Sequence, residues 1–275
     1  MNTGDAMFEL RGQVAALTGA GGVLISRMAR ELGRRGVTVI ATDRNLAAAE
    51  STASAIRAEG GSAEAIAMDV TDPGSLQTVA DELVRRWGRV DILINGAGGN
   101  RKDATPEPGQ PFFDLPAEAL RSVVDLNLMG TVLPSQVFGR EMAKRGCGAI
   151  LNLSSMTAIR PISRVVGYGA AKAAVDHFTR WLAVHLAQTC APAIRVNAIA
   201  PGFFLTEQNR FLLTNESDGS LTERGRQVLS HTPMNRFGAP EDLLGAMVWL
   251  LSPSASFVTG VVLPIDGGFS VCAGV

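Results

Sequence analysis

Short apolar runs alternate with longer stretches of helical periodicity along almost the whole chain, and this alternation constrains the fold more than any other feature. The runs are rich in Val, Ile and Leu, and the stretches between them are rich in Ala. A strand that is apolar along its whole length is typical of a parallel sheet covered on both faces by crossover helices. The pattern predicts seven strands, at residues 14–17, 37–41, 63–67, 92–94, 149–153, 194–198 and 261–264.

Parallel strands need crossover connections, and these are right-handed, so the pattern predicts an α/β fold. We expect a Rossmann-type doubly wound parallel sheet of seven strands in a three-layer α/β/α sandwich. The chain has 275 residues, enough for one large core, so residues 1–275 are expected to form a single domain. In such sheets ligands bind at the carboxyl ends of the strands, and the functional residues are expected there.

The charge of the chain is balanced, which excludes several classes of function. The 25 basic and 26 acidic residues give a formal net charge of -1 and are scattered along the sequence. Neither nucleic acid nor an anionic membrane is therefore an expected partner. No apolar run approaches the ~20 residues of a membrane span, and the N-terminus shows no signal-peptide pattern. A small-molecule partner and a cytoplasmic location are expected.

The cysteines are Cys147, Cys190 and Cys272, an odd number without CxxC spacing. This pattern argues against a disulfide framework and against a zinc site, so no metal is expected. Two long segments, 99–116 and 207–232, interrupt the strand–helix alternation after strand ends. Long loops on the ligand side of a compact domain are usually functional, and 207–232 is predicted to be a substrate lid.

The first predicted strand runs into a glycine cluster, Thr18-Gly19-Ala20-Gly21-Gly22, and then into a helix. Backbone N–H groups of such a loop and of a helix N-terminus can bind a pyrophosphate, although an ordinary Gly-rich turn would also explain the cluster. The residues expected to contact a dinucleotide here are Gly19, Gly21, Gly22, Val23 and Leu24.

Asp43 ends the second predicted strand, 24 residues beyond Gly19. A carboxylate at this place accepts hydrogen bonds from the hydroxyls of an adenine ribose and repels a 2'-phosphate. NAD(H) is therefore favoured over NADP(H), although Arg44 offers a charge for a 2'-phosphate and Asp43 is also acceptable as a plain turn residue.

Polar and small residues also follow the next strands. Asp69 and Val70 are predicted to contact the adenine, and Asn95, Ala97 and Gly98 are predicted to form a turn against which a ribose packs. A capping aspartate or an ordinary turn would explain each of these singly, but they recur at successive strand ends.

Tyr168 and Lys172 are four residues apart and share one face of a predicted helix. A nearby cation favours the phenolate, so Lys172 is expected to lower the pKa of Tyr168 from about 10 toward the working range of a general acid or base. A solvated helix face would carry the same spacing by chance.

Three further groups belong to the predicted active site. Ser155, thirteen residues before Tyr168, is placed to hydrogen-bond a substrate oxygen, with Ser154 as its neighbouring competitor. Asn127 lies in an apolar helical stretch and is either a core amide or the anchor of a water that relays protons toward Lys172. Pro201, Gly202 and Thr206 follow the sixth strand and are predicted to hold the nicotinamide.

In residue type, order and spacing this set resembles the short-chain dehydrogenase/reductase family, from about Phe8 to the C-terminus. The resemblance implies a catalytic tetrad of Asn127, Ser155, Tyr168 and Lys172, with Lys172 also bonded to the nicotinamide ribose, and a homotetramer. One departure stands out, because Val23 and Ile25 occupy positions where the family has glycine. Ile25 is expected to crowd the approach of the helix to the sheet and to weaken cofactor binding.

A finer resemblance, carried by segments such as Gly98-Gly99-Asn100 and His231-Thr232-Pro233-Met234, is to the D-mannonate oxidoreductase (fructuronate reductase) subgroup. It implies a hexuronate or aldonate substrate. The open alternatives are a reductase of another sugar acid, a polyol or a 3-oxoacyl thioester, and a non-catalytic cofactor-sensing or scaffold protein.

A hexuronate needs a cation for its carboxylate, and five basic residues lie on the expected substrate side. They are Arg101, Lys102, Arg160, Arg164 and Arg210. Arg160 and Arg210 are preferred, although solvated surface arginines remain equally consistent with the sequence. Asn100 and Asn209 are predicted to bond sugar hydroxyls.

Overall fold

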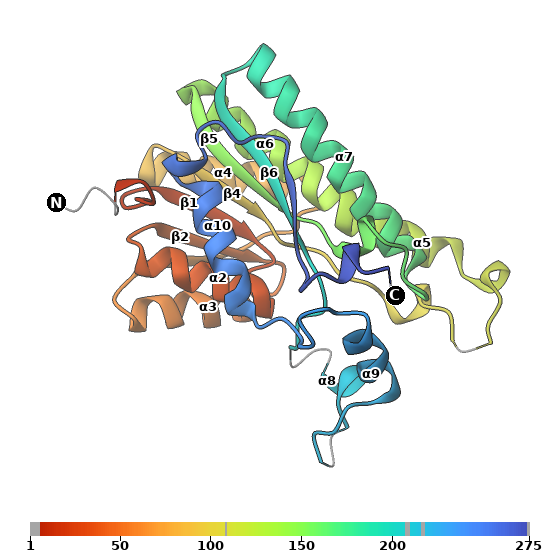
Figure 1. The fold of residues 1–275 in the computed structure, drawn as a ribbon. Coiled ribbons are helices and arrows are strands. Elements are labelled where there is room, and N and C mark those ends of the chain that lie inside the picture. The colour runs from red at the N-terminus through yellow and green to blue at the C-terminus, as the bar shows by residue number, and fades with distance from the viewer. Residues whose placement is uncertain (1–5, 108, 207–209, 216–217, 274–275) are drawn as a thin grey trace.

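Seven parallel strands form one sheet at the centre of the computed structural model, in the order β3-β2-β1-β4-β5-β6-β7 (Figure 1). The structure describes residues 6–107, 109–206, 210–215 and 218–273. Every predicted strand overlaps an observed one, so the predicted sheet is confirmed. The strands are β1 (Val14–Thr18), β2 (Thr38–Asp43), β3 (Ser62–Ala67), β4 (Ile92–Asn95), β5 (Cys147–Leu153), β6 (Ala193–Pro201) and β7 (Val262–Ile265).

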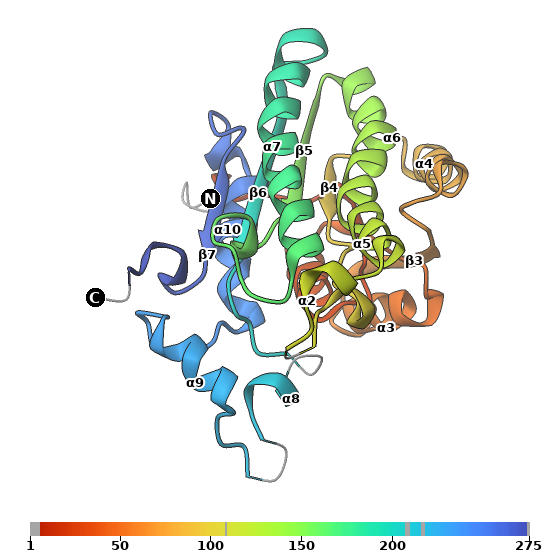
Figure 2. The ribbon, with the colours of Figure 1, turned by 90° about the vertical axis from the view of Figure 1, so that its right-hand side faces the viewer.

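Helices cover both faces of the sheet, and each layer buries its own apolar cluster. One cluster joins the sheet to α2 (Val23–Arg34), α3 (Leu46–Ala58) and α10 (Leu244–Leu251). The other joins the opposite face to α4 (Pro73–Trp87), α6 (Gly130–Arg145) and α7 (Val166–Thr189). Figures 1 and 2 show these layers from two sides. The predicted three-layer sandwich is confirmed.

The order of the strands reverses at the centre of the sheet, between β1 and β4. The chain moves outward to β2 and β3 on one side, and to β5, β6 and β7 on the other. Thr18 and Asn95, the last residues of β1 and β4, pair at this point. Connections that leave in opposite directions open a crevice above the carboxyl ends of the two strands, which is where doubly wound sheets bind ligands.

The described parts of the two interrupting segments contain short helices. Segment 99–116 contains two short 3-10 helices, η1 (Lys102–Ala104) and η2 (Phe112–Asp114). Segment 207–232 contains α8 (Arg210–Leu213) and α9 (Glu223–Ser230), and a backbone bridge joins Thr214 to Leu221. Figure 1 shows α8 and α9 projecting below the sheet on the side of its carboxyl edge. The role of this segment as a lid stays a prediction.

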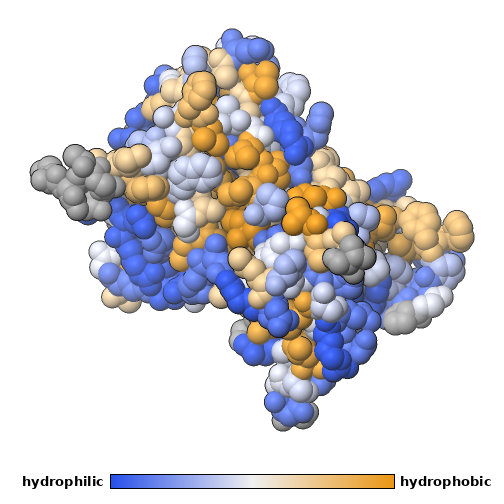
Figure 3. Space-filling model, viewed as in Figure 1, coloured by the Kyte–Doolittle hydropathy of each residue, from blue (hydrophilic) through white to orange (hydrophobic). Residues whose placement is uncertain are grey.

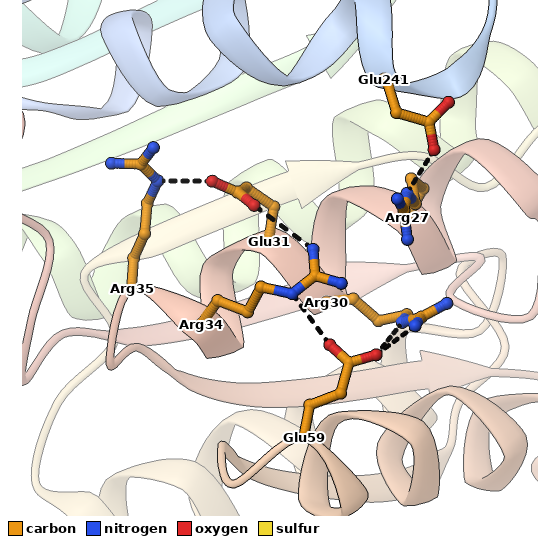
Figure 4. Close-up of polar contacts among 7 residues, drawn as sticks. All are labelled: Arg27, Arg30, Glu31, Arg34, Arg35, Glu59 and Glu241. Atoms are coloured by element: carbon orange, nitrogen blue, oxygen red, sulfur yellow. Dashed lines mark hydrogen bonds and ion pairs between the residues drawn. The ribbon is translucent and has the colours of Figure 1, made fainter.

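Ion pairs hold the outer face of α2 to its neighbours (Figure 4). Glu59, the C-cap residue of α3, forms ion pairs with both Arg30 and Arg34. The Nε of Arg27 lies 2.6 Å from a carboxylate oxygen of Glu241 in η5 (Pro240–Leu243). Each partly exposed pair contributes about 0–1 kcal/mol. Together they fix α2 from outside, while its N-terminus faces the crevice.

Apolar residues also gather on part of the molecular surface. Figure 3 shows them in the middle of the face seen in Figure 1, above the region of α8 and α9. Surface patches of this kind are typical of contacts between protein molecules. The tetrameric assembly implied by the family resemblance stays a prediction. In the described part of the chain, no helix combines the length and the apolar character that a membrane span requires.

Candidate active site

A cavity of about 1200 Å³ opens above the carboxyl ends of the strands. Its walls come from the segments that follow β1 to β6, which are far apart in the sequence. Almost all residues predicted to bind the cofactor line it, and so do three of the four predicted catalytic residues. These lining residues are Gly19, Gly21, Gly22, Val23, Leu24, Asp43, Arg44, Asp69, Val70, Ala97, Gly98, Ser155, Tyr168, Lys172, Pro201, Gly202 and Thr206.

The glycine loop between β1 and α2 presents bare backbone to this cavity. Gly19 has a φ of +69°, and a Cβ at this position would lie 2.8 Å from the Cα of Ala97. Gly22 is the N-cap of α2 and offers no side chain to its first turn. The N–H groups of that turn and the positive end of the helix dipole therefore favour an anion such as a pyrophosphate.

Asp43 ties the end of β2 to the glycine loop. One carboxylate oxygen accepts a hydrogen bond from the backbone N–H of Gly21 at 3.1 Å, and the other accepts from that of Asn45 at 2.9 Å. The negative charge is thereby fixed beside the phosphate-binding loop. An additional phosphate at this place would be repelled.

Asp69 lies at the cavity but its carboxylate is already used locally. It accepts hydrogen bonds from the backbone N–H and the hydroxyl of Thr71, at 2.8 and 2.7 Å, and these bonds lower the pKa of the Asp69 carboxyl. Val70 packs closely on Gly130, where a Cβ would lie 2.8 Å from its side chain. Asp69 and Val70 together shape the turn after β3.

Asn95 does not line the cavity, although it was predicted to contact the cofactor. Its side chain is buried and donates hydrogen bonds to Ser135 at 2.9 Å and to Asn152 at 2.8 Å. It braces β4 from within, and the wall itself is formed by Ala97 and Gly98. The Oγ1 of Thr18 accepts hydrogen bonds from the N–H of Ala97 and of the preceding residue, which fixes this turn beside the glycine loop.

Tyr168 and Lys172 lie in the first turns of α7, one turn apart as predicted. The Nζ of Lys172 lies 5.6 Å from the centre of the Tyr168 ring and donates a hydrogen bond to the carbonyl of Leu153 at 2.7 Å. Lys172 is buried, and desolvation lowers its pKa to about 8, while the carboxylate of Asp176 acts in the opposite direction.

The pKa of Tyr168 is shifted in the direction opposite to the sequence-based prediction. Burial raises it above its ordinary value, and the hydrogen bond with Ser155 offsets only part of this shift. Burial disfavours the charged phenolate, and this desolvation is the largest cause of the shift. The prediction that the pKa of Tyr168 is lowered is therefore wrong, and Tyr168 is a neutral phenol.

The two neighbouring serines have different partners. Ser155 is the N-cap of η4 (Met156–Ala158), accepts a hydrogen bond from the N–H of Thr157 at 3.2 Å, and acts to lower the pKa of Tyr168. Ser154 instead donates its hydroxyl to the buried carboxylate of Asp176. These contacts favour Ser155 as the serine that works with Tyr168.

Asn127 lies beneath the cavity wall, in a π-helical turn (η3, Asp125–Met129) between α5 (Ala117–Val124) and α6. Its amide accepts a hydrogen bond from the N–H of Gly99 at 3.0 Å and donates to the carbonyls of Gly99 and Val123. A Cβ on Gly98 would lie 2.6 Å from the Oδ1 of Asn127 and 3.2 Å from the Nζ of Lys172. The amide and the ammonium thus flank the same glycine.

Comparison with known proteins agrees with this geometry. A family model described as enoyl-(acyl carrier protein) reductase matches residues 25–270. The chain belongs to the short-chain dehydrogenase/reductase family. An uncharacterised oxidoreductase of Bacillus subtilis is 47% identical, and the match covers 97% of this chain and 98% of that protein.

Two solved structures of this family are also similar. A Haemophilus influenzae protein, provisionally assigned as a D-mannonate oxidoreductase and holding NAD, is 41% identical with a TM-score of 0.91, over 97% of this chain and 98% of that one. A gluconate 5-dehydrogenase of Burkholderia cenocepacia, in complex with NADP and tartrate, is 30% identical with a TM-score of 0.85, over 97% and 98%. The predicted class, a nicotinamide-dependent oxidoreductase of this family, is confirmed.

Of the predicted substrate-binding residues of this short-chain dehydrogenase/reductase, several do not line the cavity. Asn100 donates to Thr105 at 2.8 Å outside the cavity lining, and Asn209 lies outside the described residues. Arg160 donates to the carbonyls of Ser270 and Cys272, at 2.8 and 3.0 Å.

The remaining basic candidates also differ in position. Arg210 begins α8 and is exposed, but it does not line the cavity. Arg164 donates to the carbonyl of Pro106 at 2.8 Å. Arg101 does line the cavity, and its guanidinium pairs with Asp103 at 2.8 and 2.9 Å.

Several apolar lining residues escaped the sequence analysis. They are Leu126, Met129, Leu133, Phe203 and Phe204. Phe203 and Phe204 follow Pro201-Gly202 directly, so their place after a strand end was a usable signal. The other three lie on the helical segment that contains Asn127, and no local pattern separates their cavity-facing role from ordinary core packing.

Proposed function

We propose that this protein catalyses the NAD(H)-dependent interconversion of D-fructuronate and D-mannonate, a ketone and the corresponding secondary alcohol. The observation that carries the reaction type is that Ser155, Tyr168 and buried Lys172 all line the cavity that also holds the glycine loop. The provisional assignment of the Haemophilus influenzae relative supports the substrate.

The residues of the cavity fit a nicotinamide dinucleotide. The bare loop from Gly19 to Gly22 and the start of α2 would hold the pyrophosphate, and Lys172 and Thr206 would hold the nicotinamide end. Asp43 would accept the adenine ribose hydroxyls, and its charge favours NAD(H) over NADP(H). When bound, the reduced cofactor supplies the hydride.

Tyr168 would supply the proton to the carbonyl oxygen of the substrate. A phenol whose pKa is raised by burial is fully protonated at neutral pH, so the resting protein is prepared to act as an acid. Ser155 would hydrogen-bond the same oxygen as negative charge develops on it. Lys172, with a pKa of about 8, takes up and releases protons readily near neutral pH. It can therefore supply a proton to Tyr168 after Tyr168 has donated its own.

The carboxylate of the substrate needs a cation on the cavity wall. Both arginines already make two hydrogen bonds, Arg101 to Asp103 and Arg160 to backbone carbonyls, but Arg101 lines the cavity and Arg160 does not. Arg101 is therefore the better candidate in the described part of the chain. Arg210 stays a second candidate because it opens the segment proposed as the lid.

The experiment is an assay of purified protein for oxidation of NADH with D-fructuronate, with neutral ketoses and with 5-keto-D-gluconate. The expected result is turnover on the uronate, with little on the neutral ketoses, and slower turnover with NADPH. Activity confined to neutral ketoses would contradict the proposed substrate class. Tight NADH binding without turnover on any carbonyl would favour a cofactor-sensing protein instead.

A second candidate function is the reduction of a different keto sugar acid. The similarity to the gluconate 5-dehydrogenase of Burkholderia cenocepacia favours it. Both functions use the same proton donor and differ only in the sugar acid bound. Comparison of kcat/KM for fructuronate and 5-keto-gluconate in the same assay separates them.

A further inference from the structure

Ile25 is the residue for which the sequence analysis expected a crowded contact, and the structure shows where its side chain goes. It lies in the first turn of α2 and is only 3% exposed. Its neighbour across the crevice is Gly96, the first residue after β4. A Cβ on Gly96 would lie 2.2 Å from the Cδ1 and 2.4 Å from the Cγ1 of Ile25. No side chain fits at position 96 while Ile25 keeps its place.

The backbone of Gly96 does not itself require glycine. Gly19 has a φ of +69°, a conformation that favours glycine, whereas Gly96 is outside this left-handed region. The need at position 96 is therefore for space. The two residues are complementary in size, since the bulk of Ile25 occupies the room that the missing side chain of Gly96 leaves.

This contact joins the two loops that form the floor of the cofactor cavity. Ile25 and Gly96 both line that cavity. The N–H of Gly96 donates to the Oγ1 of Thr18 at 3.0 Å, at the start of the glycine loop. The turn then continues through Ala97 to Gly98, which lies against Lys172. A shift at Ile25 therefore moves both the phosphate-binding turn and the wall beside the catalytic lysine.

We propose that Ile25 and Gly96 form a matched positioning pair that sets the spacing between the glycine loop and the β4 turn, and thereby the affinity for the nicotinamide cofactor. The inference rests on the proposed function only in that the cavity binds this cofactor. The bulky side chain of Ile25 is accommodated at the start of α2, because Gly96 in the opposite loop has no side chain. Close packing makes such a contact sensitive to a single methyl group.

The test is a double-mutant cycle of the wild type, Ile25→Ala, Gly96→Ala and the double variant. Dissociation constants for NADH are measured by fluorescence titration, and the midpoint of thermal unfolding is measured without cofactor. Gly245→Ala is the matched control, since a Cβ there meets nothing within 4 Å and its φ is outside the left-handed region. It should leave Kd unchanged and raise the unfolding midpoint slightly, because Gly245 lies in α10 and alanine favours the helix.

In the wild-type background, Gly96→Ala is expected to raise the Kd for NADH about tenfold, because overpacking at a close contact displaces the loops. In the Ile25→Ala background the same substitution is expected to raise Kd less than about threefold. The remaining contact of the new Cβ with the carbonyl of Thr18, at 2.9 Å, is present in both backgrounds and cancels in the comparison. If Gly96→Ala alone fails to fold, recovery of a folded, NADH-binding double variant gives the same answer.

Equal effects of Gly96→Ala on Kd in both backgrounds would overturn the proposal. Coupling seen in the unfolding midpoint but absent from Kd would also overturn it, because the pair would then serve stability alone. Failure of the substrate assignment has a different signature, since the wild type would bind NADH normally and reduce no uronate. A wild type that binds no nicotinamide cofactor would overturn both.

Discussion

The two ends of the cavity are built in different ways. At the cofactor end, backbone groups and glycines provide the surface, and Asp43 is locked to the glycine loop by a hydrogen bond to Gly21. At the substrate end, Arg101 of segment 99–116 lines the cavity, and its guanidinium is engaged with Asp103. The first end follows from strand ends that are adjacent by topology, whereas the second depends on how irregular segments fold over them.

The largest expected effect is on the chemical step and not on binding at either end of the cavity. Tyr168→Phe removes the proton donor and leaves the ring in place, so turnover should fall by at least about 1000-fold. The Kd for NADH should stay within about twofold, because the glycine loop, Asp43 and Lys172 are unchanged. Steady-state kinetics and fluorescence titration check this prediction, and a variant that retains a tenth of its activity would contradict the role of Tyr168.

The next effect tests the cofactor end. Asp43→Ala removes the charge that repels a 2'-phosphate and also the hydrogen bond to Gly21, so KM for NADH should rise about tenfold. The preference for NADH over NADPH should shrink by at least the same factor. Asp43→Asn is the companion variant, because it removes the charge while an amide oxygen can still accept from Gly21. If both variants keep the wild-type preference, Asp43 does not select the cofactor.

These two regions also differ in how far the sequence predicted them. The seven strands and the residues at their ends followed from periodicity and local motifs, since burial on both faces and tight turns leave a local pattern. Asn95 was misplaced because it shares a motif with Ala97 and Gly98, and only the pleat of β4 turns its amide into the sheet. The direction of the Tyr168 pKa shift was missed because the degree of burial is a tertiary property.

The contact of Ile25 with Gly96 shows the same limit. Each residue was visible in the sequence, and a crowded helix–strand approach was expected from Ile25 alone. The space for the side chain of Ile25 comes from Gly96, 71 positions further along the chain, and no local sequence pattern connects the two residues. For the same reason the sequence did not show that Arg160 bonds to the C-terminal segment, because these hydrogen bonds are long-range.

Arginine variants sharpen the comparison at the substrate end. If Arg101 binds the substrate carboxylate, Arg101→Ala should raise KM for the uronate about fivefold to tenfold and leave KM for NADH unchanged. Arg101→Lys should recover part of the loss, because the charge remains while the bidentate geometry is lost. Arg160→Ala is the comparison variant, and a larger effect on KM from this substitution would reverse the assignment.

The smallest expected effect lies between the two ends, at the partner of Lys172. Asp176 raises the pKa of Lys172, which desolvation has lowered to about 8, and it accepts a hydrogen bond from Ser154. In Asp176→Asn the carboxylate no longer stabilises the ammonium, so the pKa of Lys172 should fall further. The proposed function needs a protonated Lys172, so kcat/KM decreases as pH rises through this pKa.

In this variant the alkaline limb of the pH profile should therefore move to lower pH, by roughly half a pH unit to one unit. The acidic limb should change little. Arg180 also faces Asp176, and Arg180→Gln is the matched control, because it changes the charge around the carboxylate without removing the partner of Lys172. An alkaline limb that stays in place in Asp176→Asn would show that the ionisation of Lys172 does not limit the reaction. The pH dependence would then have to arise from Tyr168 itself.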